Sequence, residues 1–270
     1  MLKYLWIAGL FCSAEAWALS PSTAELSSAH DAVVSIRHYA PDQTGNDAAA
    51  FCNGTLLADN VLVTAAHCLK DLYFHPELTL QIDVGAYRYT TRPTGERVRV
   101  GYATTKSFQT KVSVRFLPVL MRKLGAQGKK VRISPNEDVA VAYLNVPLAL
   151  PAEFPFAQVL PTTQNAAFVR APLARAPRVT SINFMEEMST DTKRSALLDN
   201  LKASSNHLVS KSTARVAPGD SGSPVFVTQN GVLQLVAVVK GRAETIFSNW
   251  DVYTLTHSLL CTEERLPGCN

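Results

Sequence analysis

The sequence predicts an all-β protein with one large domain or two small ones. Its apolar residues form short runs rich in β-branched side chains, such as residues 32–39, 61–65 and 233–239. Gly, Pro, Asn and Asp residues, which favour turns, separate these runs. The chain of 270 residues is long enough to bury a sizeable core, so we expect no structural metal.

Residues 1–18 have the pattern of a secretory signal peptide. An early lysine is followed by an apolar core at residues 4–11, and Ala16-Trp17-Ala18 is a small-x-small cleavage site. The core is too short to span a membrane, which takes roughly 20 apolar residues. A lipid anchor on Cys12 is the alternative, which the bulky residue before it disfavours. We therefore expect a secreted or periplasmic chain that begins at Leu19 and has no membrane anchor.

Four cysteines remain after removal of the signal: Cys52, Cys68, Cys261 and Cys269. An even number in an exported chain predicts two disulfides, although four cysteines allow three pairings. Proximity in the sequence favours Cys52–Cys68 and Cys261–Cys269. A zinc site is the competing use, but neither pair has the short C-x₂₋₄-C spacing typical of one.

The predicted strands fall into two groups. Prolines between residues 147 and 161 punctuate a boundary segment with little periodicity that lies between the two groups. A short helix is predicted around residues 194–201 and another at the C terminus. The predicted strands are residues 32–39, 50–57, 61–65 and 138–144 before the boundary, and 166–170, 178–184, 206–210, 225–227, 233–239 and 251–254 after it.

A serine lies between two glycines in Gly219-Asp220-Ser221-Gly222. Glycine allows backbone conformations that a Cβ forbids. Such a turn can expose the Ser221 hydroxyl and direct the amide N–H groups of Gly219 and Ser221 to one point, as a developing oxyanion requires. The alternative interpretation is an ordinary polar turn between two strands.

A histidine and an aspartate upstream make the catalytic interpretation stronger. His67 follows an apolar strand in Thr64-Ala65-Ala66-His67-Cys68 and is flanked by a predicted disulfide, which gives its imidazole a rigid mount for proton transfer with Ser221. Asp138 begins an apolar strand, where an unpaired charge would be costly, so a partner is expected. The alternative is an aspartate that caps the strand at the surface, and we assign the other histidines structural roles.

With these motifs in this order, the sequence resembles the trypsin and chymotrypsin family of serine endopeptidases, in particular its secreted bacterial members. The resemblance implies two antiparallel six-stranded β-barrels, residues 19–160 and 161–270, with the active site between them and a short C-terminal helix. It assigns Ser221 as nucleophile, His67 as general base and Asp138 as the residue that orients His67. It implies no cofactor, and a protein or peptide substrate.

Three positions depart from the family pattern. Ser223 stands where most animal members have glycine, a feature shared with several secreted bacterial members. No cysteine precedes the serine turn, so a bridge that usually braces the specificity pocket is missing. Lys240 stands where the family usually has a serine that bonds the catalytic aspartate. Lys240 and the missing bridge favour the alternative function, a catalytically impaired homologue that binds proteins.

The resemblance also implies two ion pairs. The α-ammonium of Leu19 would be buried against Asp220, so that export itself would create the active enzyme without a separate propeptide. Arg215 falls at the floor of the primary substrate pocket, and Asp251 reaches the same pocket. Because a buried unpaired charge is costly, we expect Arg215 and Asp251 to pair, which would favour apolar side chains in the pocket. A free Arg215 would instead favour acidic side chains, and a dominant Asp251 basic ones, and we rank the three outcomes in this order.

Positive charge is concentrated in one stretch, although the whole chain carries a net charge of only +4. No acidic residue occurs between Glu96 and Glu137, and an insertion around residues 118–130 accounts for part of this stretch. This basic stretch is suited to binding an acidic substrate or an anionic surface. We favour a solvated rim of strands, and expect no nucleic acid because no nucleic-acid motif accompanies the charge. The basic residues are Arg97, Arg99, Lys106, Lys111, Arg115, Arg122, Lys123, Lys129, Lys130 and Arg132.

Overall fold

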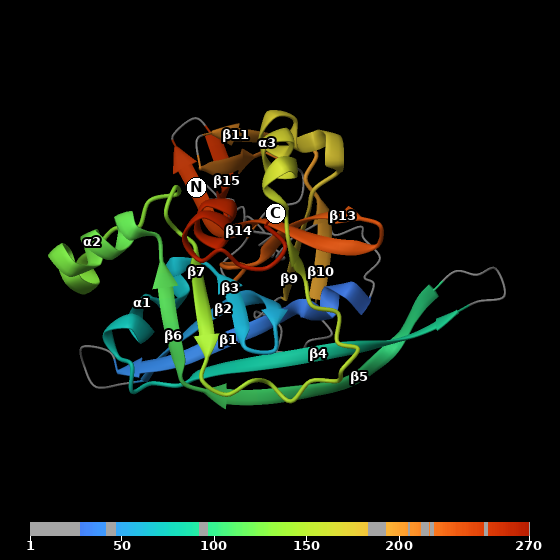
Figure 1. Ribbon diagram of the computed structural model, residues 1–270, viewed down its shortest axis with the longest axis horizontal. Helices are drawn as coiled ribbons and strands as arrows, with labels where there is room; N and C mark the ends of the chain where they lie inside the picture. Colours follow the sequence, from blue (N-terminus) through green and yellow to red (C-terminus); the bar gives the residue numbers. More distant parts are fainter. Residues whose placement is uncertain are drawn as a thin grey trace, which may run out of the picture.

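The structure is a computed structural model that describes residues 28–41, 47–91, 97–182, 193–204, 206–211, 216, 219–245 and 248–269. The predicted signal peptide, Leu19 and Arg215 lie outside these residues. The described chain is mostly β and forms two curled antiparallel sheets (Figure 1). This confirms the predicted fold class and is consistent with a chymotrypsin-like two-barrel fold. The sheets hold seven and eight strands in the described residues, where six each were expected.

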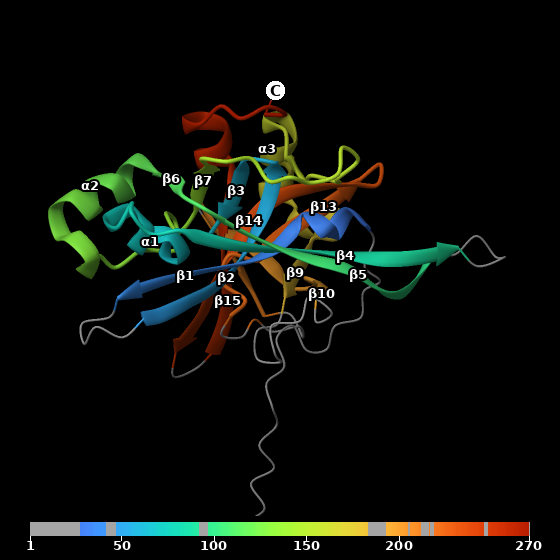
Figure 2. The ribbon, with the colours of Figure 1, turned by 90° about the horizontal axis from the view of Figure 1, so that it is seen from below.

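The first sheet has the strand order β5-β4-β1-β2-β3-β7-β6, and every neighbouring pair is antiparallel. The long β4–β5 hairpin ends at one end of the molecule, and helix α2 (Pro118–Gln127) lies at the other, as both views show (Figures 1 and 2). The strands are β1 (Val33–Pro41), β2 (Asp47–Ala58), β3 (Val61–Thr64), β4 (Leu80–Thr91), β5 (Arg97–Thr110), β6 (Val112–Phe116) and β7 (Ala140–Leu144).

The second sheet has the order β10-β9-β13-β14-β15-β12-β11, again antiparallel, and the short β8 adds to β14 in parallel. Its strands are β8 (Gln158–Val159), β9 (Arg178–Ile182), β10 (Lys193–Leu197), β11 (Leu201–Ser204), β12 (His207–Ser210), β13 (Pro224–Gln229), β14 (Val232–Thr245) and β15 (Ser248–Leu255).

The helices are short and lie outside the sheets. The predicted C-terminal helix is present as a π-helical segment, and the predicted insertion forms α2 with the 3₁₀ turn that follows it. That 3₁₀ turn is η2 (Gly128–Lys130), and the π-helical segment is η5 (Ser258–Glu263). The other helices of the described chain are α1 (Ala66–Phe74), α3 (Thr162–Arg170), η1 (Ser28–Ala32) and η3 (Pro172–Arg175).

Two predicted elements were wrong. The strand expected at residues 166–170 belongs to α3, which buries Phe168 completely, while its neighbours stay at the surface. A short apolar run does not distinguish a strand from a helix by its periodicity. The helix expected at residues 194–201 is largely strand β10, which pairs with β9 from Lys193 opposite Ile182 onward. Pairing with the neighbouring strand overrides the weak helix propensity of this segment.

Three apolar clusters make up the core. One is enclosed by the first sheet and includes Leu56, Leu62 and Ile82. Another is enclosed by the second sheet and includes Val225 and Tyr253. The third joins the two halves, because it combines side chains from β1, β3 and β7 with side chains from β13, β14 and η5. The two sheets are therefore docked through a continuous apolar interface.

Both predicted disulfides are present. Cys52 of β2 is bonded to Cys68 of α1, and Cys261 is bonded to Cys269 near the C terminus. Among the described residues, no helix has the length and apolar character needed to cross a membrane.

Candidate active site

His67 is mounted on rigid structure. Strand β3 ends at Thr64, Ala65 and Ala66 are fully buried, and α1 begins at Ala66. The Cys52–Cys68 disulfide ties the first turn of α1 to β2. The His67 side chain is about one-third exposed, at 35%. The backbone of His67 is thus held rigidly while the outer edge of its imidazole is open to solvent, which suits a group that exchanges protons with a ligand.

Asp138 lies beneath the imidazole and is completely buried. Its Oδ2 is 2.8 Å from Nδ1 of His67, and its Oδ1 accepts a hydrogen bond of 2.9 Å from the backbone N–H of the same residue. One carboxylate therefore fixes both the ring and the backbone of His67. Because the carboxylate is an acceptor, this contact places the proton on Nδ1 and leaves Nε2 as the base.

The charge of Asp138 is stabilised by its partners. Burial alone would raise the pKa of this carboxyl. The hydrogen bond and charge of His67, together with the charge of Lys240, outweigh burial and hold the Asp138 pKa below its usual range. The aspartate predicted to have a partner thus has two, and it is ionised at neutral pH.

Lys240 is the residue that the sequence analysis identified as a departure from the pattern of the family it resembles. Its Nζ is 3.0 Å from Asp138 Oδ2 and also donates to the carbonyl of Ile133 at 3.0 Å. The pairing of β14 with β15 shifts register between Val239 and Gly241, so Lys240 is the extra residue of a β-bulge. A bulge redirects the side chain that it carries. Lys240 therefore supplies a hydrogen bond to the buried carboxylate of Asp138.

The turn that carries Ser221 packs against the segment that carries His67. Gly222 has φ +78°, and a Cβ at this position would collide with Thr64 Oγ1 and the carbonyl of Asn53. The amide of Gly222 donates to Val239 at 2.8 Å, which ties the turn to β14. Ser221 is half-buried. The glycine after the serine is thus required by close packing onto the histidine segment.

Asn53 holds the serine turn from the opposite half of the molecule. Its backbone N–H donates to the carbonyl of Ser221 at 2.7 Å, and its side-chain Nδ2 donates to the carbonyl of Gly219 at 2.9 Å. Its Oδ1 accepts from the amide of Ile182 at 3.0 Å. Asn53 is fully buried in β2, so the sequence Asn53-Gly54-Thr55, although formally a glycosylation sequon, is not exposed for modification.

The geometry of this turn suits an oxyanion site. Gly219 has φ +94°, a conformation that only glycine adopts readily. Within the described part of the chain, the amide N–H groups of Gly219 and Ser221 have no acceptor. Asp220, between them, is buried and accepts a hydrogen bond from Ser181 Oγ. Its expected partner Leu19 lies outside the described residues.

Asp251 is buried and ion-paired with a residue that the sequence analysis did not identify. Arg242 Nε lies 3.4 Å from Asp251 Oδ1, and Arg242 also donates to the carbonyl of Val216 at 2.7 Å. The expected partner, Arg215, lies outside the described residues. The charge of Asp251 is therefore balanced by a cation two residues after Lys240.

One residue of the basic stretch anchors α2 beside the site. Lys123 Nζ donates to Glu137 at 2.7 Å, and Glu137 directly precedes Asp138. Burial would raise the Glu137 pKa, but Lys123 and the Ser134 amide lower it below its usual value. Lys123 thus has a structural role rather than a free surface charge.

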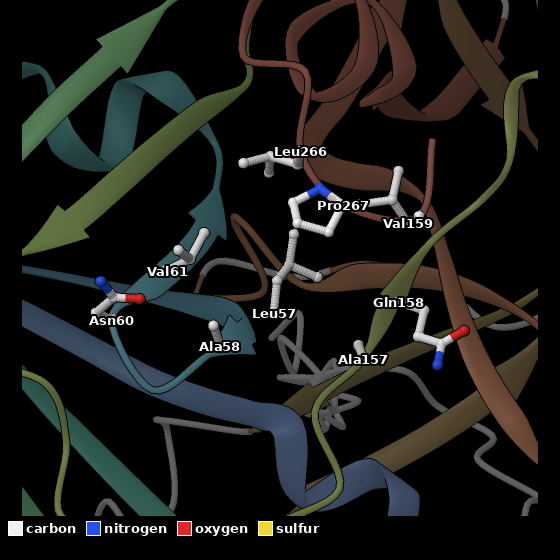
Figure 3. A pocket seen from close by; sticks show the side chains of 10 residues that line it. Leu57, Ala58, Asn60, Val61, Ala157, Gln158, Val159, Leu266 and Pro267 are labelled. Carbon is white, nitrogen blue, oxygen red and sulfur yellow. The ribbon is translucent and has the colours of Figure 1, made fainter. Parts of the chain in front are cut away.

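Two other places have features of a binding site but lack the groups that one needs. Cys52, Cys68 and His67 lie within 4.8 Å of one another, but the disulfide leaves only His67 as an available metal ligand. A cavity of about 500 Å³ lies between the β2–β3 turn, β8 and the C-terminal segment, where Leu57, Val159 and Pro267 converge (Figure 3). No titratable side chain lines it, so it offers no catalytic group.

The sequence did not reveal the roles of Asn53, Ser181 and Arg242. The available signal for Asn53 was a polar side chain in a predicted buried strand, which requires hydrogen-bond partners.

A scan of the sequence against models of known protein families finds no match, and a search of curated proteins finds none either.

Proposed function

We propose that this protein is an exported serine endopeptidase of the chymotrypsin-like kind. The observation that carries the proposal is the 2.8 Å contact between His67 Nδ1 and Asp138, which lies beside the turn that bears Ser221. Two amide donors on that turn, which have no acceptor among the described residues, add a site for negative charge. The motifs around these residues are those of the family that the sequence resembles.

In acylation, His67 Nε2 accepts the Ser221 hydroxyl proton while Oγ bonds to the peptide carbonyl carbon. The carbonyl oxygen becomes an oxyanion that accepts from the Gly219 and Ser221 amides; losing one such donor typically costs about 2.7–4 kcal/mol of transition-state stabilisation. Asp138 stabilises the imidazolium without taking its proton. The imidazolium then protonates the leaving amine as the C–N bond breaks.

Deacylation repeats these steps with water in place of the amine. His67 removes a proton from water, the hydroxide adds to the acyl carbon, and the proton returns to Ser221 Oγ as the ester bond breaks. Every proton transfer uses side chains of the protein, so the reaction needs no cofactor.

The expected setting is secreted or periplasmic. Two disulfides suit an oxidising compartment, and the pattern of residues 1–18 predicts export. The substrate is a protein or peptide. The basic residues left at the surface are available for an anionic partner.

The proposal is tested by a fluorophosphonate probe on the purified chain beginning at Leu19. We expect covalent labelling that is lost in Ser221→Ala and in His67→Ala. Ser223→Ala is the matched control, because Ser223 is a buried serine two residues away and is not the nucleophile. Folding of each variant is checked by the two disulfides and by far-UV circular dichroism.

A folded chain that is not labelled at any pH from about 6 to 9, the range in which a histidine base is active, would contradict the enzyme. That result would favour the alternative, a homologue that binds proteins through the same surface.

A further inference from the structure

A second cavity, of about 770 Å³, adjoins the candidate triad. Residues 132–135 form one side, and residues 240–242 with Val252 form the other. Its volume is in the range of sites that hold small ligands or a few side chains. The first side follows α2 and η2, and the second is the bulged part of β14.

The cavity is positively charged. Arg132, Lys240 and Arg242 line it, and none of its lining residues is acidic. Lys240 and Arg242 each pair with a buried aspartate and still expose 24% and 31% of their side chains. Arg132 is exposed and makes no hydrogen bond or ion pair with any described residue. Arg132 is therefore a cation that lines the cavity and has no counter-charge among the described residues.

The cavity is next to the nucleophile turn. Val239 accepts from Gly222 and donates to Ser223, both at 2.8 Å, and the next three residues of the chain line the cavity. Lys240 bonds the same aspartate that orients His67. A peptide whose scissile bond lies at Ser221 would thus have neighbouring side chains within reach of this cavity.

We infer that this cavity is a subsite for an acidic side chain of the substrate, with Arg132 as its principal cation and Lys240 as a second donor. The inference rests on the proposed function for the identity of the ligand as a peptide. A carboxylate suits the site because it accepts hydrogen bonds from guanidinium in a bidentate arrangement. A lysine or arginine side chain would be repelled by Arg132, whose charge no described residue balances, and would find no acidic residue in the lining.

The test measures binding without turnover. Ser221→Ala is titrated with fluorescein-labelled alanine hexapeptides in which one Glu, or one Gln, is moved through the positions, and fluorescence anisotropy gives each Kd. At one position we expect Glu to bind at least about tenfold more tightly than Gln, the scale of one charge-assisted hydrogen bond. The ratio of the Kd of the Gln peptide to that of the Glu peptide should fall as salt is raised from about 0.05 to 0.5 M.

Two further variants locate the effect. In Ser221→Ala with Arg132→Gln, the Glu-to-Gln ratio should fall below about threefold. Arg122→Gln is the matched control, since Arg122 is an exposed arginine of the same basic stretch that does not line the cavity. Equal binding of Glu and Gln at every position, or a ratio that Arg132→Gln leaves unchanged, would overturn the inference.

The outcome is independent of the proposed activity. If Glu is preferred through Arg132 but the wild-type chain is never labelled by the fluorophosphonate, the cavity is an acidic-peptide site on an inactive homologue. If labelling occurs and Glu is not preferred, the protein is a hydrolase without this subsite.

Discussion

Lys240 Nζ lies 3.0 Å from Asp138 Oδ2, the same oxygen that contacts His67 Nδ1 at 2.8 Å. One carboxylate oxygen therefore contacts both a lysine and the histidine that would act as general base in the proposed reaction. The lysine positions the aspartate and also favours its ionised form.

Replacing Lys240 by Met should make the fold more sensitive to acid. The charge of Lys240 helps to lower the pKa of Asp138, so without it the carboxyl is protonated at a higher pH, and the midpoint of acid unfolding should move up by about one pH unit. Lys240→Arg keeps the charge and should leave the midpoint in place. An unmoved midpoint in Lys240→Met would mean that the charge of Lys240 does not stabilise ionised Asp138.

Asp138→Asn should abolish most activity and destabilise the fold in a pH-dependent way. We expect kcat to fall by about 10⁴-fold because the wrong tautomer of His67 is held. The folded pKa of Asp138 is below its unfolded value of about 3.9. The stability gained from this ionisation is thus complete above that value and is lost as pH falls through the folded pKa.

Urea denaturation measures this stability difference. At pH 7 the variant should be less stable by about 3 kcal/mol, because Lys240 loses a buried partner, and the gap should narrow at about pH 3. A stability difference of the same size at both pH values would contradict the dependence of stability on the ionisation of Asp138.

Gly222→Ala should unfold or inactivate the protein, because a Cβ there collides with Thr64 and Asn53 at φ +78°. The expected cost is about 2–5 kcal/mol, the sum of backbone strain and overpacking. Gly231→Ala is a close control, since Gly231 has φ +77° but open space around its Cβ position, and it should cost only about 1–2 kcal/mol. Similar losses in thermal unfolding for both variants would argue against the packing explanation.

Asn53→Ala should lower both stability and kcat. It leaves the carbonyl of Gly219 and the amide of Ile182 without their side-chain partner, at a cost of about 2–4 kcal/mol. Because Gly219 belongs to the oxyanion turn, kcat should fall more than KM rises. Thr55→Val in the same buried strand removes a hydroxyl that has no partner in the described chain, so its effect should be near zero. Unchanged kcat in Asn53→Ala would show that the turn keeps its shape without Asn53.

The sequence was most informative where chemistry and local pattern coincide. His67 follows an apolar strand beside a cysteine, and Asp138 begins another, so both side chains could be placed without knowledge of the fold. Lys240 could be recognised as a departure, but its contact with Asp138 depends on a bulge that only the pairing of β14 with β15 reveals. The ion pair between Arg242 and Asp251 could not be predicted for a similar reason, since these residues lie opposite each other on the paired strands β14 and β15.

Asn53 belongs to β2 of the first sheet, whereas Gly219, Ser221 and Ile182 belong to the second half of the chain. The conformation of the oxyanion turn is thus a property of the docked pair of halves, not of either alone. During export, a chain whose two halves have folded but have not yet docked should therefore be unable to cleave other proteins. Refolding followed in parallel by tryptophan fluorescence and fluorophosphonate labelling would test this timing. Labelling that precedes the docking phase would contradict it.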